Sequence, residues 1–445
     1  MTSVDRLPIG WMVSTIGDLC ERPQYGWTTR AAGLGEGLKL LRTTDITRGP
    51  IDWETVPVCA EEPPSHAKYL LSPGDLVVSR AGSVGVSALL GVGPPAVFAS
   101  YLIRFRPKTG MSARYLVWFL QSSAYWNQIS ASAAGIALQN VNAKKLSAVS
   151  LPVAPYSEQV RIVAAIEEHL SRLDDAVAAL EHVRAALPRY RAAVLKAACE
   201  GRLVDAPVSG AWGSTTIGAL CEVQVGATPS RGRSEYWGGR IPWVSSGEVA
   251  FCRIRATRET ITREGLESSS TELHPPGTVL LGMIGEGKTR GQAAILDIEA
   301  CNNQNSAAIR VPRDKLVSEF LYYYLASQYS TTRRAGSGNN QPALNKKRVQ
   351  SIPLPLPPLE DQHRIVAEVD RRLSLADAAD RAVSAGLGKA KRLRQAILKR
   401  AFEGKLVPQD PNDEPARVLL ERIRTARANT TPRDRRQAKR PRVRR

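Results

Sequence analysis

The stretches YSEQVRIVAAI (156–166) and LEDQHRIVAEV (359–369) carry one pattern of residues at an offset of 203 positions. Three further pairs of segments follow in the same order at offsets of 201 or 203: WMVSTIGDLCE (11–21) with WGSTTIGALCE (212–222), SPGDLVVSRAGSVG (72–85) with PPGTVLLGMIGEG (275–287), and AVLKAACEGRLV (193–204) with AILKRAFEGKLV (396–407). Matching islands in one order at a nearly constant offset predict an internal tandem repeat.

Each of the first two stretches opens a run in which apolar residues recur three and four positions apart. The positions are Val163, Ile166, Leu170, Leu173, Val177, Leu180, Leu187 and Val194 in the first half, and Val366, Val369, Leu373, Ala376, Val383, Leu387, Ala390 and Ile397 in the second. This spacing predicts two long helices that pack together as an antiparallel coiled coil. Pro188 is expected to restart or kink the first helix. The alternative is that each helix packs only on its own globular domain.

The segments that precede the helices are rich in Gly and Pro and contain short apolar runs such as DLVVS (75–79) and YLIRF (101–105), which predict strands. Some helix is expected too, as in ARYLVWFLQSSAYWNQI (113–129). The fold class is therefore α+β: two mixed α/β domains separated by two long helices, with a pseudo-twofold relation between the repeats. The boundaries are 1–155 and 209–355 for the domains, 156–208 and 356–412 for the helical segments, and 413–445 for a basic tail expected to be disordered.

The formal net charge is +19, of which residues 421–445 carry +9. A strong positive charge points to a polyanionic partner such as a nucleic acid. An anionic membrane is the weaker alternative, because no apolar run approaches the ~20 residues of a spanning helix. The six cysteines form no C-x-x-C pair, which argues against a zinc site and predicts reduced thiols in a cytoplasmic protein.

The stretch GMIGEGKT (282–289) matches the phosphate-loop pattern G-x-x-x-x-G-K-[ST]. A working phosphate loop joins a strand to a helix, whereas TVLL (278–281) and AAIL (293–296) predict strands on both sides. The first repeat keeps Gly82 opposite Gly285 but lacks the Lys-Thr pair. The stretch is therefore predicted to be a glycine-containing hairpin turn, and an ATP-dependent DNA-acting enzyme that uses Lys288 remains the rival interpretation.

The junction PLPPLEDQHRIV (355–366) and the helix end ILKRAFEGKL (397–406), together with the doubled layout, resemble the specificity (S) subunit of type I restriction-modification enzymes. The first junction, VAPYSEQVRIV (153–163), departs from the pattern by having Tyr156 and a single proline. The resemblance implies two target recognition domains, each reading half of a bipartite site in double-stranded DNA. It also implies helices that set the spacing and dock two methyltransferase (M) subunits.

In that family the M subunits bind S-adenosylmethionine and methylate adenine at N6, and a motor-nuclease (R) subunit joins for restriction. This chain is accordingly expected to hold no catalytic residue, cofactor or metal. Its own sequence agrees, because it has no [ND]-P-P-[YF] methyltransferase motif and no H-E-x-x-H cluster. A stand-alone DNA-binding regulator without a methyltransferase is the second rival.

Cations on phosphates supply affinity, and amides, hydroxyls and arginines at base edges supply sequence recognition. The candidates in the first domain are Arg42, Thr43, Thr44, Arg80, Gln139, Asn140, Asn142, Lys144 and Lys145. Those in the second are Ser245, Ser246, Lys288, Thr289, Arg290, Asn302, Asn303, Gln304, Asn305, Asn339, Asn340, Gln341, Asn345, Lys346 and Lys347. Many of these polar side chains could instead cap turns. Because the two sets differ, the predicted DNA site is asymmetric.

Overall fold

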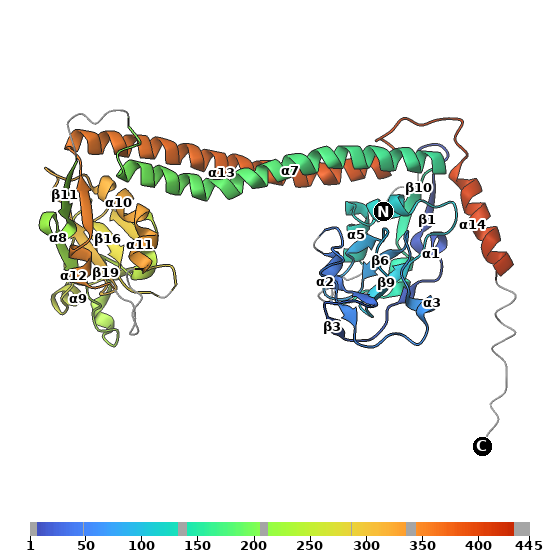
Figure 1. Cartoon of the computed structure of the whole chain (residues 1–445), viewed down its shortest axis with the longest axis horizontal. Coiled ribbons are helices and arrows are strands. Elements are labelled where there is room, and N and C mark those ends of the chain that lie inside the picture. Colours follow the sequence, from blue (N-terminus) through green and yellow to red (C-terminus); the bar gives the residue numbers. More distant parts are fainter. Residues whose placement is uncertain are drawn as a thin grey trace, which may run out of the picture. The chain divides into compact units, whose positions relative to one another are not determined.

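A computed structural model describes residues 7–47, 49–131, 140–204, 212–285, 287–334 and 344–430 (Figure 1). Its contacts divide the chain into two units. Unit 1 comprises Met1–Ala179 and Gly386–Arg445, and unit 2 comprises Leu180–Ala385. The long helices α7 (Tyr156–Cys199) and α13 (Leu359–Phe402) each contribute residues to both units.

The described part of unit 1 contains three sheets. Their strand orders are β1-β10, β2-β9-β6-β7 and β3-β5-β4-β8, and the β4–β8 pair is parallel. The strands are β1 (Met12–Thr15), β2 (Gln24–Tyr25), β3 (Ala31–Gly33), β4 (Lys39–Leu41), β5 (Val58–Cys59), β6 (Leu76–Ser79), β7 (Ser87–Leu89), β8 (Ala96–Phe98), β9 (Leu102–Phe105) and β10 (Ser150–Val153). The strands predicted in DLVVS and YLIRF are confirmed as β6 and β9.

The described part of unit 2 also contains three sheets, with orders β11-β20, β12-β19-β16-β17-β14 and β15-β13-β18. The strands are β11 (Gly213–Thr216), β12 (Glu222–Val225), β13 (Trp237–Val244), β14 (Cys252–Ile254), β15 (Glu259–Ile261), β16 (Val279–Gly282), β17 (Ala293–Leu296), β18 (Cys301–Asn302), β19 (Ser306–Arg310) and β20 (Pro353–Leu356). The antiparallel ribbons β1–β10 and β11–β20 and the hairpins β6–β7 and β16–β17 recur in both units, which confirms the repeat.

Short helices complete each unit. Unit 1 has α1 (Ile16–Leu19), α2 (Thr43–Ile46), α3 (His66–Tyr69), α4 (Ala113–Phe119), α5 (Ser123–Ala131), α6 (Ala143–Ser147) and α14 (Ala416–Thr430). Unit 2 has α8 (Ile217–Leu220), α9 (Arg263–Glu267), α10 (Ser318–Ser327), α11 (Tyr329–Arg334), α12 (Lys346–Gln350) and the 3₁₀ helices η2 (Ser234–Tyr236) and η3 (Ser246–Glu248). The helix predicted over 113–129 is present as α4 and α5.

The helices α7 and α13 pack antiparallel. Asp174 pairs with Arg394 in unit 1, and Arg191 pairs with Asp377 at 2.8 Å in unit 2. The later residue of α7 pairs with the earlier residue of α13, so the two helices are antiparallel. Asp377 and Arg394 are the repeat equivalents of Asp174 and Arg191, so each ion pair is the repeat equivalent of the other.

The predicted apolar stripe faces inward, although its burial differs along the helices. Ile166 and Leu170 are buried near the start of α7 and Val194 near its end, whereas Leu180 and Leu187 between them are half-buried. The helix ends also enter the domain cores. The ring centroid of Phe402 in α13 lies 5.1 Å from that of Tyr115 and 5.2 Å from that of Phe119. Coiled-coil packing and packing on the domains therefore occur along different parts of the same helices.

Of the two outcomes expected at Pro188, a restart of the helix is wrong, because α7 runs without a break through that residue, and a kink stays a prediction. A proline inside a helix removes one N–H donor and costs ~3 kcal/mol. Packing of α7 along its length against α13 and the domain cores offsets this local cost.

A buried glutamine explains why the junction motif recurs. Gln362 donates from Nε2 to the carbonyls of Pro357 (2.8 Å) and Lys315 (3.0 Å), and its Oε1 accepts from the Val317 amide at 2.8 Å. In the first repeat Gln159 donates to the Ala154 carbonyl (2.9 Å) and accepts from the Ser112 amide (3.2 Å). Both glutamines are fully buried. Each therefore fastens the start of a long helix to its domain.

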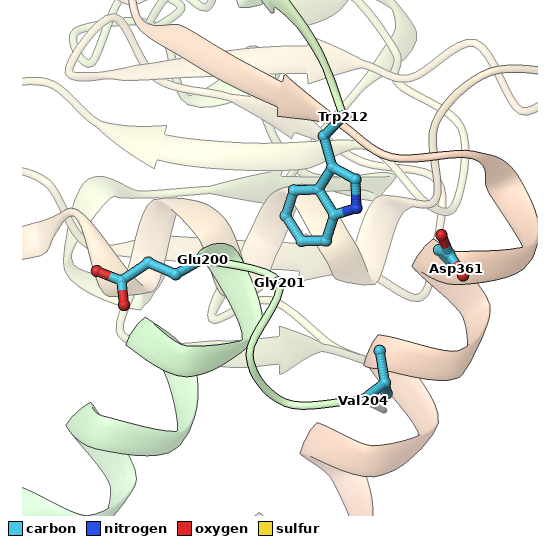
Figure 2. A pocket seen from close by; sticks show the side chains of 5 residues that line it. All are labelled: Glu200, Gly201, Val204, Trp212 and Asp361. Carbon is cyan, nitrogen blue, oxygen red and sulfur yellow. The ribbon is translucent and has the colours of Figure 1, made fainter. Parts of the chain in front are cut away.

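A tryptophan near the start of each repeat packs beside the junction. In unit 1 the Trp11 indole donates to Glu158 at 2.8 Å, and Gln409 donates to the same carboxylate. In unit 2 Trp212 and Asp361 line a small pocket with Glu200, Gly201 and Val204 (Figure 2). The position that corresponds to Gln409 is residue 206, which lies outside the described residues.

The expectation of a disordered tail from residue 413 is wrong for the first part of that segment. Helix α14 places Ala416, Leu419, Leu420 and Ile423 in the core of unit 1. These residues recur at helical spacing and form an apolar face within a charged sequence. Residues 431–445 lie outside the described part. Within the described ranges no helix is long and apolar enough to span a membrane, and the six cysteines form no disulfide.

Candidate nucleic-acid interface

In unit 1 the turn after β6 brings several predicted residues together. Gly82 has φ +77°, a left-handed conformation that glycine adopts easily. The Val141 amide donates to the Arg80 carbonyl at 2.9 Å and ties the entry of α6 to this turn. Asn142 caps α6 by accepting from the Lys145 amide at 2.9 Å. Asn140, Asn142, Lys144 and Lys145 are exposed beside the turn, whereas Gln139 lies outside the described residues.

Arg80 is held at this face by two side chains. Its Nε donates to Oδ1 of Asn140 at 3.3 Å, and its guanidinium lies 5.2 Å from the ring centroid of Tyr25. The Tyr25 hydroxyl accepts from the Ala143 amide at 3.0 Å. Together with Lys144 and Lys145 this arrangement presents positive charge around the N-terminus of α6, which suits an anionic partner.

Thr43 reaches the same region, whereas Arg42 forms an ion pair with Asp45 that balances its charge. Its guanidinium donates to both carboxylate oxygens of Asp45 at 3.1 and 2.8 Å, and this hydrogen bonding raises the pKa of Arg42. Thr43 Oγ1 lies 3.4 Å from Ser79 Oγ, next to the glycine turn, and Thr44 is exposed on the first turn of α2.

Unit 2 repeats this backbone arrangement with different side chains. The Leu344 amide donates to the Met283 carbonyl at 3.0 Å, and Asn345 caps α12 by accepting from the Arg348 amide at 2.9 Å. Exposed Lys346 donates to Gln224 at 3.2 Å, and Lys347 is exposed next to it. Asn339, Asn340 and Gln341 lie outside the described residues.

The stretch that matches a phosphate loop joins β16 to β17, which are antiparallel, as predicted for a hairpin. Lys288 is exposed and Thr289 half-buried, and the Lys288 carbonyl accepts from the Tyr329 hydroxyl at 2.8 Å. Arg290 is only 9% exposed and donates to the Arg333 carbonyl at 3.2 Å, so it braces the loop and does not face solvent as expected. No helix follows Thr289 to cradle a phosphate within the described residues.

The Asn302–Asn305 run is mostly structural. Asn302 is fully buried and donates to the Ser306 carbonyl at 2.7 Å, and Asn303, 6% exposed, accepts from the Asn305 amide at 3.2 Å. Gln304 is exposed and accepts from Thr228, and Asn305 is half-buried. The expectation that all four amides face DNA is therefore wrong for Asn302 and Asn303. Their side-chain amides are buried and hydrogen-bonded to the surrounding backbone.

Beneath this loop lies a network that the sequence analysis missed. Arg310 Nε donates to Nδ1 of buried His274 at 3.2 Å, so Nε2 carries the proton that His274 donates to Oδ1 of Asn302 at 2.9 Å. Burial, and then the charge of Arg310, lower the pKa of His274. A neutral histidine thus supports the loop that carries Gln304.

Ser245 and Ser246 also have local roles. Ser245 is the N-cap of η3, and both its amide (2.9 Å) and its hydroxyl (2.8 Å) donate to Glu248. Ser246 is half-buried. This matches the alternative that polar side chains cap turns. Tyr25 of β2 was missed as well, although an exposed aromatic side chain beside polar residues is a usual signal for nucleic-acid contact.

Comparison with known proteins finds relatives over most of the chain. The family model described as type I restriction modification DNA specificity domain matches residues 8–185 and again 210–374. The StySPI specificity subunit of Salmonella potsdam is 26% identical over 458 residues, covering 95% of this chain and 96% of that protein. The EcoKI specificity subunit of Escherichia coli K12 is 25% identical over 468 residues, covering 96% and 97%.

Two solved structures share the fold. A chain from a structural study of the assembly and conformational transition of a type I R-M system has a TM-score of 0.70 at 23% identity, covering 90% of this chain and 99% of that one. The HsdS subunit from Thermoanaerobacter tengcongensis has a TM-score of 0.61 at 24% identity, covering 90% and 98%. The doubled match over most of the chain and the duplicated turn-and-helix face lead to one assignment: this chain belongs to the type I restriction-modification DNA specificity family.

Proposed function

We propose that this chain is the DNA sequence-recognition subunit of a type I restriction-modification complex and performs no catalysis itself. The observation that carries this proposal is the duplicated face, in which a glycine turn meets a capped helix N-terminus flanked by lysines, once in each unit. Because Arg80 and Tyr25 of the first face have no equivalents in the second, the two faces read different half-sites. The DNA target is therefore bipartite and asymmetric.

The helices α7 and α13 set the spacing between the half-sites and dock two methyltransferase subunits. Two exposed apolar residues related by the repeat support this role: Tyr190 is 42% exposed and Leu393 is 46% exposed. Leu393 also lines an apolar groove with Leu173, Ala176 and Ile397. An exposed apolar side chain at the same position of both repeats suits two copies of one partner.

The methyltransferase partners bind S-adenosylmethionine and methylate adenine at N6, and this chain binds no cofactor. Restriction requires a further motor-nuclease subunit, and the complex works in the cytoplasm. Among the described residues no cluster of three or more His, Cys, Asp or Glu side chains could hold a metal ion.

Subunit counting tests the proposal. Native mass spectrometry of the chain with its methyltransferase should give two methyltransferases per chain. Leu393→Glu should remove one copy, Tyr190→Glu the other, and the double variant both. Leu375→Glu serves as the control, because Leu375 is 56% exposed but corresponds to Arg172 in the first repeat, so the site is not duplicated. One copy on the unaltered chain, or no effect of either variant, would contradict the docking model.

A further inference from the structure

The two repeats have the same backbone but different side chains at one point of the candidate interface. Arg80 and Met283 are repeat equivalents, and their carbonyls accept from Val141 at 2.9 Å and from Leu344 at 3.0 Å. Met283 is 3% exposed and belongs to the core of unit 2, whereas Arg80 is half-buried at the surface of unit 1. The first repeat therefore has a cation where the second has none.

Arg80 is oriented before any partner arrives. The Tyr25 ring lies against its guanidinium at 5.2 Å, and the bond from the Ala143 amide to the Tyr25 hydroxyl fixes that ring. The Arg80 Nε donates a hydrogen bond to Oδ1 of Asn140 at 3.3 Å. Within the described ranges Nη1 and Nη2 donate no hydrogen bond. A guanidinium restrained in this way offers its two terminal nitrogens to a partner with two adjacent acceptors.

We propose that Arg80 is a specificity-determining residue that reads one guanine in the half-site bound by unit 1, donating to O6 and N7. Guanine places two acceptors side by side in the major groove, whereas adenine places a donor beside its N7. Exposed Lys144 and Lys145 contact the flanking phosphates. This inference rests on the proposed DNA-recognition function, and it assigns no equivalent contact to Met283.

Substitutions that preserve charge separate a base contact from a phosphate contact. The full chain, assembled with its methyltransferase, would methylate a DNA library randomised at each position of the target. Arg80→Lys retains the positive charge but lacks the two terminal nitrogens that donate side by side. Discrimination at one guanine should therefore fall by roughly 5- to 150-fold, while the base preference at other positions stays the same. Arg80→Met, which copies the second repeat, should act in the same way.

Lys144→Ala is the matched control and should weaken methylation evenly over all sequences. If Arg80→Lys lowers methylation of all sequences equally, Arg80 contacts a phosphate. If it changes the base preference at no position, Arg80 contacts no base. Either result would overturn the proposal.

A second measurement starts from the unaltered protein, and its result for that protein does not depend on whether the variants fold. Methylation of guanine N7 with dimethyl sulfate should block binding at one guanine of one half-site. Binding by Arg80→Met should no longer be sensitive at that guanine. Absence of an interfering guanine in both half-sites overturns the proposal while leaving the recognition function intact. Absence of any bipartite target refutes both.

Discussion

Replacing Gln362 by Met should loosen the start of α13 from the rest of unit 2. Methionine has a similar volume, so the substitution removes hydrogen bonds without opening a large cavity. Gln362 makes three bonds, to Pro357, Lys315 and Val317, and at ~1 kcal/mol net for each the loss is about 3 kcal/mol. Gln159→Met removes two bonds and should cost about 2 kcal/mol in unit 1.

Hydrogen exchange measures this loss at the site itself. A loss of about 3 kcal/mol corresponds to a fall of roughly 100-fold in the protection of the Val317 amide, whose acceptor is removed. Glu360→Gln, an exposed change two residues away, is the control and should leave protection unchanged. If Val317 stays protected within a factor of about two in Gln362→Met, the glutamine does not fasten the helix and this explanation of the junction motif is refuted.

Two other predictions concern the candidate interface. The pKa of His274 is lowered in the folded state, so the unfolded chain binds a proton near pH ~6.5 that the folded chain does not, and stability should fall as pH drops below ~6.5. Urea unfolding of unit 2 followed against pH should show this fall, and His274→Gln should reduce it; an equal slope in the variant would contradict the assignment. Because Lys288 lies in a hairpin, calorimetry should detect no ATP binding by the unaltered chain and no change with Lys288→Ala. Saturable binding that Lys288→Ala abolishes would reinstate the phosphate loop.

The elements predicted from sequence were those encoded by local or repeated patterns. Heptad spacing specified α7 and α13, because a 3.6-residue period can be read without knowing the partner. The β16–β17 hairpin was predicted from two apolar runs on either side of a glycine turn. The first repeat supported it, because it has no equivalent of Lys288. These inferences needed no tertiary contacts.

Most of the errors arise from tertiary contacts; the exception is α14, whose apolar spacing is present in the sequence itself. Asn302 looked like a base reader because its partners His274 and Ser306 meet it only when the strands pair. Tyr25 and Arg80 are distant in sequence and become neighbours through the sheet β2-β9-β6-β7. The high charge of residues 413–445 led to a prediction of disorder, although the apolar residues of α14 recur at helical spacing. The low helix propensity of Pro188 led to a prediction of a helix break, which packing of α7 prevents.

Recognition of a two-part DNA site at a spacing set by the long helices can be tested by mapping methylated bases in cells with the chain, without it, and with seven residues inserted at matched points of both α7 and α13. We expect N6-methyladenine in a two-part asymmetric motif, and this methylation should be lost when the chain is removed. The insertion, about 10 Å of helix, should lengthen the unread spacer by roughly three base pairs. Methylation that persists without the chain would refute the recognition role, and a spacer that the insertion leaves unchanged would refute the spacing role of α7 and α13.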